Sequence, residues 1–498
     1  MADALQQLKS RLADIQSLGA ISWLLDWDQR TIMPPGGGAH RADHLALVER
    51  LAHERLIDPE VGRLLDELAP VEASLDPDSI DAATIRVTRR DHDKAVRVPA
   101  KLHEEMARAS AESAPIWLEA KATSDFELFL PVLERNVELR RQYIACFEPR
   151  DEPYDILLDD FEPEMRSAEV TRIFAQIRDE LVPLIAELRD RDVDDSFLTG
   201  DFPVDRQVAL DNAVVDLFGH RPDTWRVDPT EHPFASGAGI DDIRITTHYY
   251  PDALKSIFST MHEYGHGLYE HQLPRELAHL PIGSAASFAM HESQSRLWEN
   301  MVGRSLPFWR FFYPRVQELF PDALGDVELE RFYAGINKAQ PSLIRIEADE
   351  VTYGMHVILR FELEQDIVNG RVELRDLPER WAEKMHEYLG VEVPDDTHGV
   401  LQDVHWGAGL IGYFSTYLLG TVMSVQIWEK ILEDVPDLED QIERGEFTAL
   451  RKWLELNVHA HGRKYPPQEI LRRAVGTTID AKPYLAYLKK KYGASVTA

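Results

Sequence analysis

Apolar side chains recur at three- and four-residue spacings along most of this 498-residue chain. That spacing places them on one face of an α-helix, so the pattern predicts a series of amphipathic helices. The clearest of these cover residues 4–18, 41–52, 124–146, 167–191, 204–218, 327–340, 350–368 and 377–389, and another follows Trp406. Helices therefore dominate the predicted fold.

Strand signals are scarce. Residues 242–250 are the best candidate, because they alternate in polarity, contain β-branched side chains and end at Pro251. The chain has no repeat of fixed period and no Gly/Ser-rich linker that would divide it. The sequence thus predicts a mainly α protein, a single large helical domain over residues 1–498, with one small β-sheet.

A pair of histidines follows the predicted strand. Residues 251–271 are predicted to form a helix with Pro251 in its first turn. On such a helix His262 and His266 are one turn apart, so both imidazoles can bind one metal ion. Glu263 can reach a water molecule on that ion and act as its general base. The pattern predicts a metallopeptidase, with zinc as the expected metal.

Two glycines, Gly265 and Gly267, flank the second histidine inside this helix. Each costs a helix about 1 kcal/mol relative to alanine. We therefore expect another stretch of backbone to pass close to them.

A third metal ligand must come from elsewhere in the chain. Metzincins require Gly and His three and six residues after the second histidine, and Tyr269 and Gln272 occupy those places, which excludes that class. The predicted helix over residues 284–304 offers two carboxylates, Glu292 and Glu299, on one face. One of them can be the ligand and the other its neighbour, and spacing alone leaves both assignments open.

The charge and the targeting signals narrow the class of protein. A net charge of −33, from 54 basic and 87 acidic residues, argues against nucleic-acid binding. Cys146 is the single cysteine, so an intramolecular disulfide is impossible. The first 17 residues favour an amphipathic helix over a signal peptide, and the uncharged stretch 407–425 is rich in glycine and hydroxyl groups. We expect a cytoplasmic protein that does not span or bind a membrane.

At this point the residues resemble a known family, the carboxypeptidase Taq family of metallocarboxypeptidases, along most of the chain. The segments that carry the resemblance are His232-Pro-Phe234, Asp242-Ile-Arg244-Ile-Thr246, His262-Glu-Tyr-Gly-His266, His291-Glu292-Ser-Gln-Ser295, Ile344-Arg345-Ile-Glu-Ala-Asp349 and Gly399-Val-Leu-Gln-Asp403-Val-His405-Trp406. One departure is His248, where an arginine is expected before Tyr249.

The resemblance implies that Glu292 is the third ligand and Glu263 the general base. It implies an all-helical fold like that of neurolysin and angiotensin-converting enzyme, with a deep groove and usually a homodimer. The implied activity is release of C-terminal residues with broad specificity, proline being disfavoured. Zinc is the implied metal, and cobalt or manganese can serve.

A carboxypeptidase also needs a cation for the substrate's terminal carboxylate. Arginine suits this role because its planar fork binds a carboxylate through two hydrogen bonds. Arg345 is the candidate, and the alternative is an ion pair between Arg345 and Glu347 or Asp349.

Donors for the tetrahedral intermediate are also required. His405 and Tyr413 are candidate catalytic groups and Tyr417 a candidate substrate contact, with core packing as the alternative for each tyrosine. Arg244 and His232 are expected to shape the strand that receives the substrate backbone.

The expected function is a metal-dependent carboxypeptidase acting on peptides. An oligopeptidase that cuts internal bonds of short peptides is the first alternative. A helical binding protein with a vestigial metal site is the second, and the intact set of His262, Glu263, His266 and Glu292 argues against it.

Overall fold

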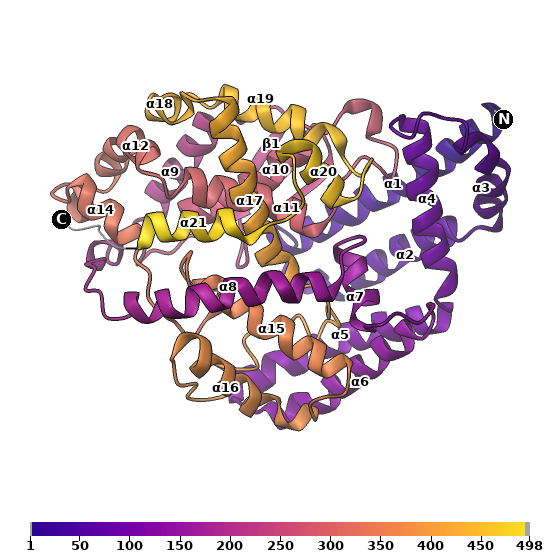
Figure 1. Ribbon diagram of the computed structural model, residues 1–498, viewed down its shortest axis with the longest axis horizontal. Coiled ribbons are helices and arrows are strands. Elements are labelled where there is room, and N and C mark those ends of the chain that lie inside the picture. The colour runs from indigo at the N-terminus through magenta and orange to yellow at the C-terminus, as the bar shows by residue number, and fades with distance from the viewer. Residues whose placement is uncertain (1, 494–498) are drawn as a thin grey trace. The chain divides into compact units, whose positions relative to one another are not determined.

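The computed structural model describes residues 2–493 and is about 67% helical (Figure 1). These residues form two compact units, each assembled from three stretches of chain. Unit 1 draws on residues 2–96, 194–336 and 424–478, and unit 2 on 97–193, 337–423 and 479–493. Since the stretches interleave, a boundary cannot be recognised from local composition, and the single domain over residues 1–498 stays a prediction.

Unit 1 contains the sheet and most of the helices. Its helices are α1 (Ala2–Thr31), α2 (Gly38–Leu56), α3 (Pro59–Glu72), α9 (Val204–Phe218), α10 (Ser256–His271), α11 (Phe288–Arg296), α12 (Leu306–Leu319), α13 (Pro321–Leu324), α14 (Leu329–Ile336), α18 (Leu438–Glu443), α19 (Thr448–Asn457) and α20 (Pro467–Val475). Leu8 and Leu12 of α1 pack on Leu64 and Leu68 of α3 in one part of its core.

Unit 2 contains helices joined by loops and no β-strand among its described residues. Its helices are α5 (Ala100–Thr123), α6 (Phe126–Ile144), α7 (Tyr154–Phe161), α8 (Ser167–Leu188), α15 (Tyr353–Val368), α16 (Leu377–Leu389) and α21 (Ala481–Tyr492). Two further helices, α4 (Ile80–Arg97) and α17 (Ser415–Asp434), contribute residues to both units. The first and last parts of this unit meet where α21 lies along α8 (Figure 1).

The small sheet of unit 1 has the strand order β1-β3-β2. Strand β1 (Trp225–Pro229) runs parallel to β3 (Asp242–Thr247), and β2 (Ala235–Gly239) runs antiparallel to it. The prediction for residues 242–250 therefore found the central strand but set its end three residues late. Strand β2, Ala-Ser-Gly-Ala-Gly, has no β-branched side chain and gave no sequence signal.

Helix periodicity predicted helices over residues 204–218 and 377–389. These ranges agree with the observed first and last residues of α9 and α16. The metal-motif helix was predicted to begin at Pro251, and this is wrong, because α10 begins at Ser256. The carbonyls of Pro251 and Asp252 accept hydrogen bonds from Phe202 and Gly200, each at 2.9 Å. Backbone groups bonded to a distant segment cannot also form the first helical turn.

The uncharged stretch 407–425 enters α17 without making it a membrane helix. Across residues 2–493, none of the helices has both the length and the apolar character needed to cross a bilayer.

Candidate metal centre and active-site residues

The two motif histidines and Glu292 converge in unit 1. The Nε2 atoms of His262 and His266, one turn apart on α10, each lie 3.5 Å from Oε2 of Glu292 on α11. One ligand atom from each of the three residues lies within 4.8 Å of the others. Two imidazoles and one carboxylate are the donor set of catalytic zinc sites that keep a further position for water or substrate. The geometry therefore fits a divalent metal at this point.

The close approach of α10 and α11 depends on Gly265. A Cβ atom placed on Gly265 would lie 2.4 Å from the carbonyl oxygen of Gln294 and 2.6 Å from Cα of Ser295. The expectation of a neighbouring backbone is thus confirmed at this position, and the backbone belongs to the helix that carries Glu292. At Gly267 the expectation is wrong, because the neighbours are the side chains of Trp225 and Ile243.

We predict that Gly265→Ala lowers the free energy of unfolding by about 1–3 kcal/mol, since backbone atoms cannot move aside as a flexible side chain can. It should also weaken metal binding by pushing α11 away from α10. Gly19→Ala is the matched control, because a Cβ there has no neighbour within 4 Å and alanine favours a helix by about 1 kcal/mol. Denaturant unfolding of both variants and chelator competition measure the two effects. Equal stability of the two alanine variants would contradict the spacing argument.

The outer nitrogen of His262 is held by the second carboxylate of the motif. Nδ1 of His262 lies 2.8 Å from Oε2 of Glu299. This bond turns Nε2 toward Glu292 and fixes the ring orientation, as carboxylate partners of metal-binding histidines do. The spacing did not decide which of the two carboxylates is the ligand. In the structure Glu292 faces Nε2 of both histidines, while Glu299 contacts Nδ1 on the other side of the His262 ring.

His266 is oriented by ring contacts. Its imidazole stacks on that of His291 with ring centroids 4.3 Å apart and planes at 14°. Tyr269 extends the same stack, with its ring 5.7 Å from His291 and 4.6 Å from His459. Among the described residues, no hydrogen-bond partner faces the buried Nδ1 of His266. Ring packing therefore fixes the orientation of the His266 imidazole, as the contact with Glu299 fixes that of His262.

Burial and charge shift the pKa values of these groups in opposite directions. Burial lowers the pKa of His266 to about 3, so its imidazole is neutral, the form that binds a metal. Burial also acts against the charged form of His262, but the carboxylates of Glu292 and Glu299 raise its pKa to about 9. Burial raises the pKa of Glu263 to about 7. The carboxylates thus favour positive charge at the point where the three ligand atoms meet.

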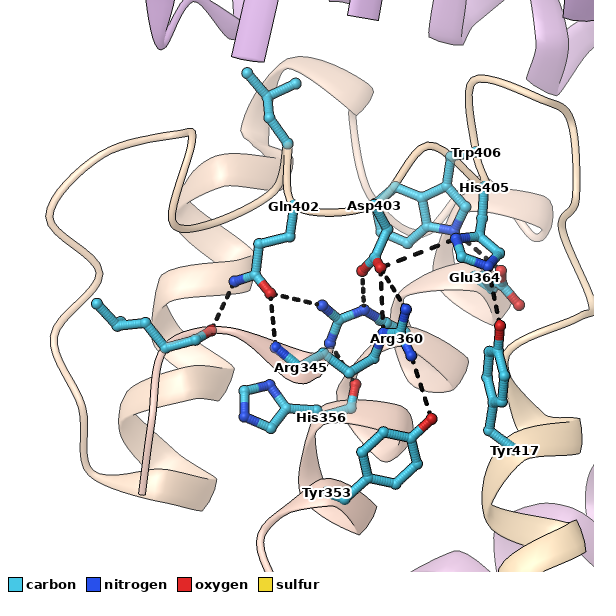
Figure 2. A network of polar contacts seen from close by, with 12 residues as sticks. Arg345, Tyr353, His356, Arg360, Glu364, Gln402, Asp403, His405, Trp406 and Tyr417 are labelled. Carbon is cyan, nitrogen blue, oxygen red and sulfur yellow. Dashed lines mark hydrogen bonds and ion pairs between the residues drawn. The ribbon is translucent and has the colours of Figure 1, made fainter. Parts of the chain in front are cut away.

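Arg345 lies in unit 2 and is already engaged. Its Nε and Nη2 donate to Oδ1 of Asp403 at 3.1 and 2.7 Å, and its Nη1 donates to the hydroxyl of Tyr353 at 3.2 Å. Figure 2 shows Asp403 between Arg345 and Arg360, whose Nε donates to the other oxygen at 2.7 Å. Burial would raise the pKa of Asp403, but the two guanidinium charges lower it well below its usual range. An ion pair was the alternative to a substrate-binding role for Arg345. The structure contains such an ion pair, but its partner is Asp403 and not the predicted Glu347 or Asp349.

The structure brings His405, Tyr413 and Tyr417 together in unit 2. Nε2 of His405 lies 3.3 Å from the hydroxyl of Tyr417, and its ring centroid lies 5.5 Å from that of Tyr413 (Figure 2 shows the first pair). Burial lowers the pKa of His405 to about 4, so the imidazole is neutral. His405 and Tyr417 are thus within hydrogen-bond distance while Tyr413 packs against the ring of His405, and the catalytic roles of all three stay predictions.

Helix α15 holds the loop that carries His405 from both sides. Arg360 bonds to Asp403 and, through Nη2, to Gln402 at 3.1 Å before the histidine. Glu364, one turn later, accepts from the Trp406 indole at 2.9 Å and from the backbone N–H of Gly412 at 3.0 Å after it. These two residues were missed in the sequence, because a charged pair inside a helical pattern gives no sign of being buried.

Comparison with known proteins gives the family. A family model described as carboxypeptidase Taq (M32) metallopeptidase matches residues 7–492. This chain belongs to the M32 carboxypeptidase Taq family. It is 41% identical to thermostable carboxypeptidase 1 of Thermus thermophilus, over 98% of each chain, and 35% identical to carboxypeptidase 1 of Bacillus subtilis, over 94% of each. The M32 carboxypeptidase structure from Deinococcus radiodurans matches with a TM-score of 0.94 and 37% identity, covering 99% of both chains.

The remaining predicted residues of this M32 chain lie around the sheet of unit 1. Arg244 of β3 bonds to Asp242 at 2.8 and 3.0 Å, and its guanidinium lies 4.2 Å from the ring centroid of the buried Trp27. The carbonyl of His232 accepts from Arg30 at 3.3 Å. His248, where the resemblance led us to expect an arginine, places Nδ1 2.9 Å from the carbonyl of Thr230. These contacts support the sheet itself, and substrate roles for Arg244 and His232 stay predictions.

Proposed function

We propose that this chain is a metal-dependent carboxypeptidase that releases C-terminal residues from peptides. The observation that carries the proposal is the convergence of His262, His266 and Glu292 on one point, with the buried Glu263 on the same helix. Membership in a metallopeptidase family supports the metal, and the donor set favours zinc, with cobalt or manganese as substitutes.

A divalent cation held by the three ligands would polarise the scissile carbonyl and lower the pKa of a water molecule. Glu263 is the proposed general base. Its carboxylate is buried, and its Oε2 meets no hydrogen-bond partner among the described residues. It can take a proton from the attacking water and pass it to the leaving amine.

We propose that His405 and Tyr413 donate hydrogen bonds to the oxygen of the tetrahedral intermediate, and that Tyr417 contacts the substrate. Their neutral N–H and O–H groups suit an oxygen on which negative charge develops. Tyr417 also lies within reach of His405, so it can fix which ring nitrogen carries the proton.

For Arg345 we propose recognition of the substrate's terminal carboxylate. A guanidinium has five N–H donors, and Asp403 and Tyr353 use three of them. The ion pair with Asp403 then holds the guanidinium in place for the donors that remain. In the same proposal, Arg244 and His232 shape the strand that receives the substrate backbone, proline is disfavoured as the released residue, and the active form is a cytoplasmic homodimer.

The test of this function compares each peptide as its free acid and as its C-terminal amide. A carboxypeptidase should remove successive single residues from the free acid and should fail on the amide, and mass spectrometry of the product ladder over time shows both. Arg345→Gln should raise KM for the free acid by about 10- to 100-fold, since a charge-assisted hydrogen bond contributes about 1.5–3 kcal/mol. Tyr353→Phe is the control, because it removes only the hydroxyl that accepts from Nη1 of Arg345 and leaves the charge of Arg345 in place.

Equal rates on free acids and amides would contradict the carboxypeptidase and favour an oligopeptidase. If Arg345→Gln left KM unchanged, Arg345 would serve only its ion pair with Asp403. Sedimentation velocity measures the homodimer separately.

A further inference from the structure

We propose that Arg296 is the positioning residue of this metal centre, because one guanidinium holds both the ligand Glu292 and the histidine partner Glu299. Its Nε donates to Oε1 of Glu292 at 2.7 Å, and its Nη1 donates to Oε2 of Glu299 at 3.1 Å. The inference rests on the proposed function, and it adds a residue outside the candidate ligand set of His262, His266 and Glu292.

The first consequence concerns the ligand carboxylate. Carboxylates bind metal ions through one oxygen or through both. In Glu292 the oxygen Oε1 is taken by Arg296, while Oε2 lies 3.5 Å from each histidine nitrogen. Ser295 adds a hydroxyl bond to Oε2 at 3.1 Å. Arg296 thus selects which oxygen faces the imidazoles, and Oε2 is the oxygen that Glu292 would offer to a metal.

The second consequence concerns His262. The oxygen of Glu299 that accepts from Arg296 is the same oxygen that lies 2.8 Å from Nδ1 of His262. Arg296 therefore fixes that carboxylate, and the carboxylate fixes the imidazole. Two of the three proposed ligands, His262 on α10 and Glu292 on α11, are oriented by one side chain.

The helix that carries these groups has a local change of geometry. Helix α11 ends at Arg296 and continues as a π-helical segment, Leu297–Val302, in which Gly303 N–H bonds to the carbonyl of Trp298. Such segments inside helices are frequent at functional sites. Here it carries Glu299, while Glu292 precedes it on the regular turns. The side chain of Arg296 is 14% exposed, so its bonds to both carboxylates form largely away from solvent.

A simple electrostatic view of Arg296 makes the opposite prediction to ours. If Arg296 were only a positive charge near a bound cation, its removal would relieve repulsion and strengthen metal binding. If it positions Glu292 and Glu299, its removal lets both carboxylates turn and weakens metal binding. The sign of the change in affinity separates the two.

The experiment titrates Zn²⁺ into the metal-free full-length protein against a chromophoric chelator. Arg296→Gln should bind Zn²⁺ about 10- to 100-fold more weakly than the wild type, the range found for residues that orient metal ligands. Arg296→Lys keeps the charge but replaces the planar guanidinium by one flexible ammonium. Its affinity for Zn²⁺ should therefore lie between those of Arg296→Gln and the wild type. Arg275→Gln is the matched control, because it removes an exposed two-bond pair with Asp241 and the same charge. The control should bind like the wild type.

Two further readouts distinguish positioning from a general structural role. The visible spectrum of the Co²⁺-substituted protein should change in Arg296→Gln and Arg296→Lys and stay constant in Arg275→Gln. The effects of Arg296→Gln and Glu299→Gln on affinity should fall short of additive in the double variant, because both act on His262. Unchanged or tighter Zn²⁺ binding in Arg296→Gln would overturn the inference. A wild-type protein that binds no Zn²⁺ would instead overturn the proposed function.

Discussion

Replacing Glu263 by glutamine should lower kcat/KM by about 10²- to 10⁴-fold while the metal stays bound. Glutamine keeps the shape of the side chain but cannot accept a proton. Glu263 is 5% exposed and burial raises its pKa to about 7, so its carboxylate is suited to exchange a proton near neutral pH. Steady-state kinetics on a free-acid peptide and metal analysis of the same sample measure the two quantities.

The control for this variant is Glu276→Gln, which changes an exposed carboxylate a few residues after α10. It should leave both the kinetics and the metal content as in the wild type. Full activity in metal-loaded Glu263→Gln would show that another group accepts the proton.

The second large effect is expected at the ligand carboxylate. Glu292→Gln should lower the affinity for Zn²⁺ by more than 100-fold, because it removes the anionic ligand that lies 3.5 Å from each histidine nitrogen. Glu299→Gln should lower it by about 10- to 100-fold, because Glu299 does not face the histidine Nε2 atoms and supports the ligands through its contacts with His262 at 2.8 Å and with Arg296 at 3.1 Å. Chelator competition on the metal-free proteins gives both constants, and kcat/KM at saturating Zn²⁺ shows what each variant retains.

The order of the two effects decides between assignments that the spacing alone left open. A greater loss in Glu299→Gln than in Glu292→Gln would make Glu299 the ligand. Both variants remove one negative charge, on α11 and on the π-helical segment that continues it, so each serves as the control for the other.

The helical fold was readable from the sequence because side-chain periodicity is a local property. The predicted ranges 204–218 and 377–389 match α9 and α16. In both helices the apolar spacing starts at the first helical residue and stops at the last. Prediction was wrong at Pro251, where the local preference for a first helical turn lost to hydrogen bonds with Phe202 and Gly200. Those partners come from about fifty residues earlier, and no local pattern records them.

The site residues show the same difference between what local sequence predicts and what long-range contacts decide. The histidines and Glu263 lie on one helix, so their spacing alone brings them together. Arg345 shows the limit: its predicted ion-pair partners were neighbours in sequence, while the observed partner, Asp403, comes from a distant loop. Arg296 was passed over because nothing local shows that it serves two carboxylates at once.

By itself the sequence determined a mainly helical protein with a metal motif of two histidines and a glutamate, since helical period and spacing depend only on the chain's neighbouring residues. Only the tertiary structure decided how α11 meets α10. Gly265 lets the two backbones approach, so that Glu292 faces both histidines, Glu299 supports one of them, and Arg296 joins the two carboxylates. Contacts between separate helices depend on how their faces pack, and that information is absent from the spacing within either helix.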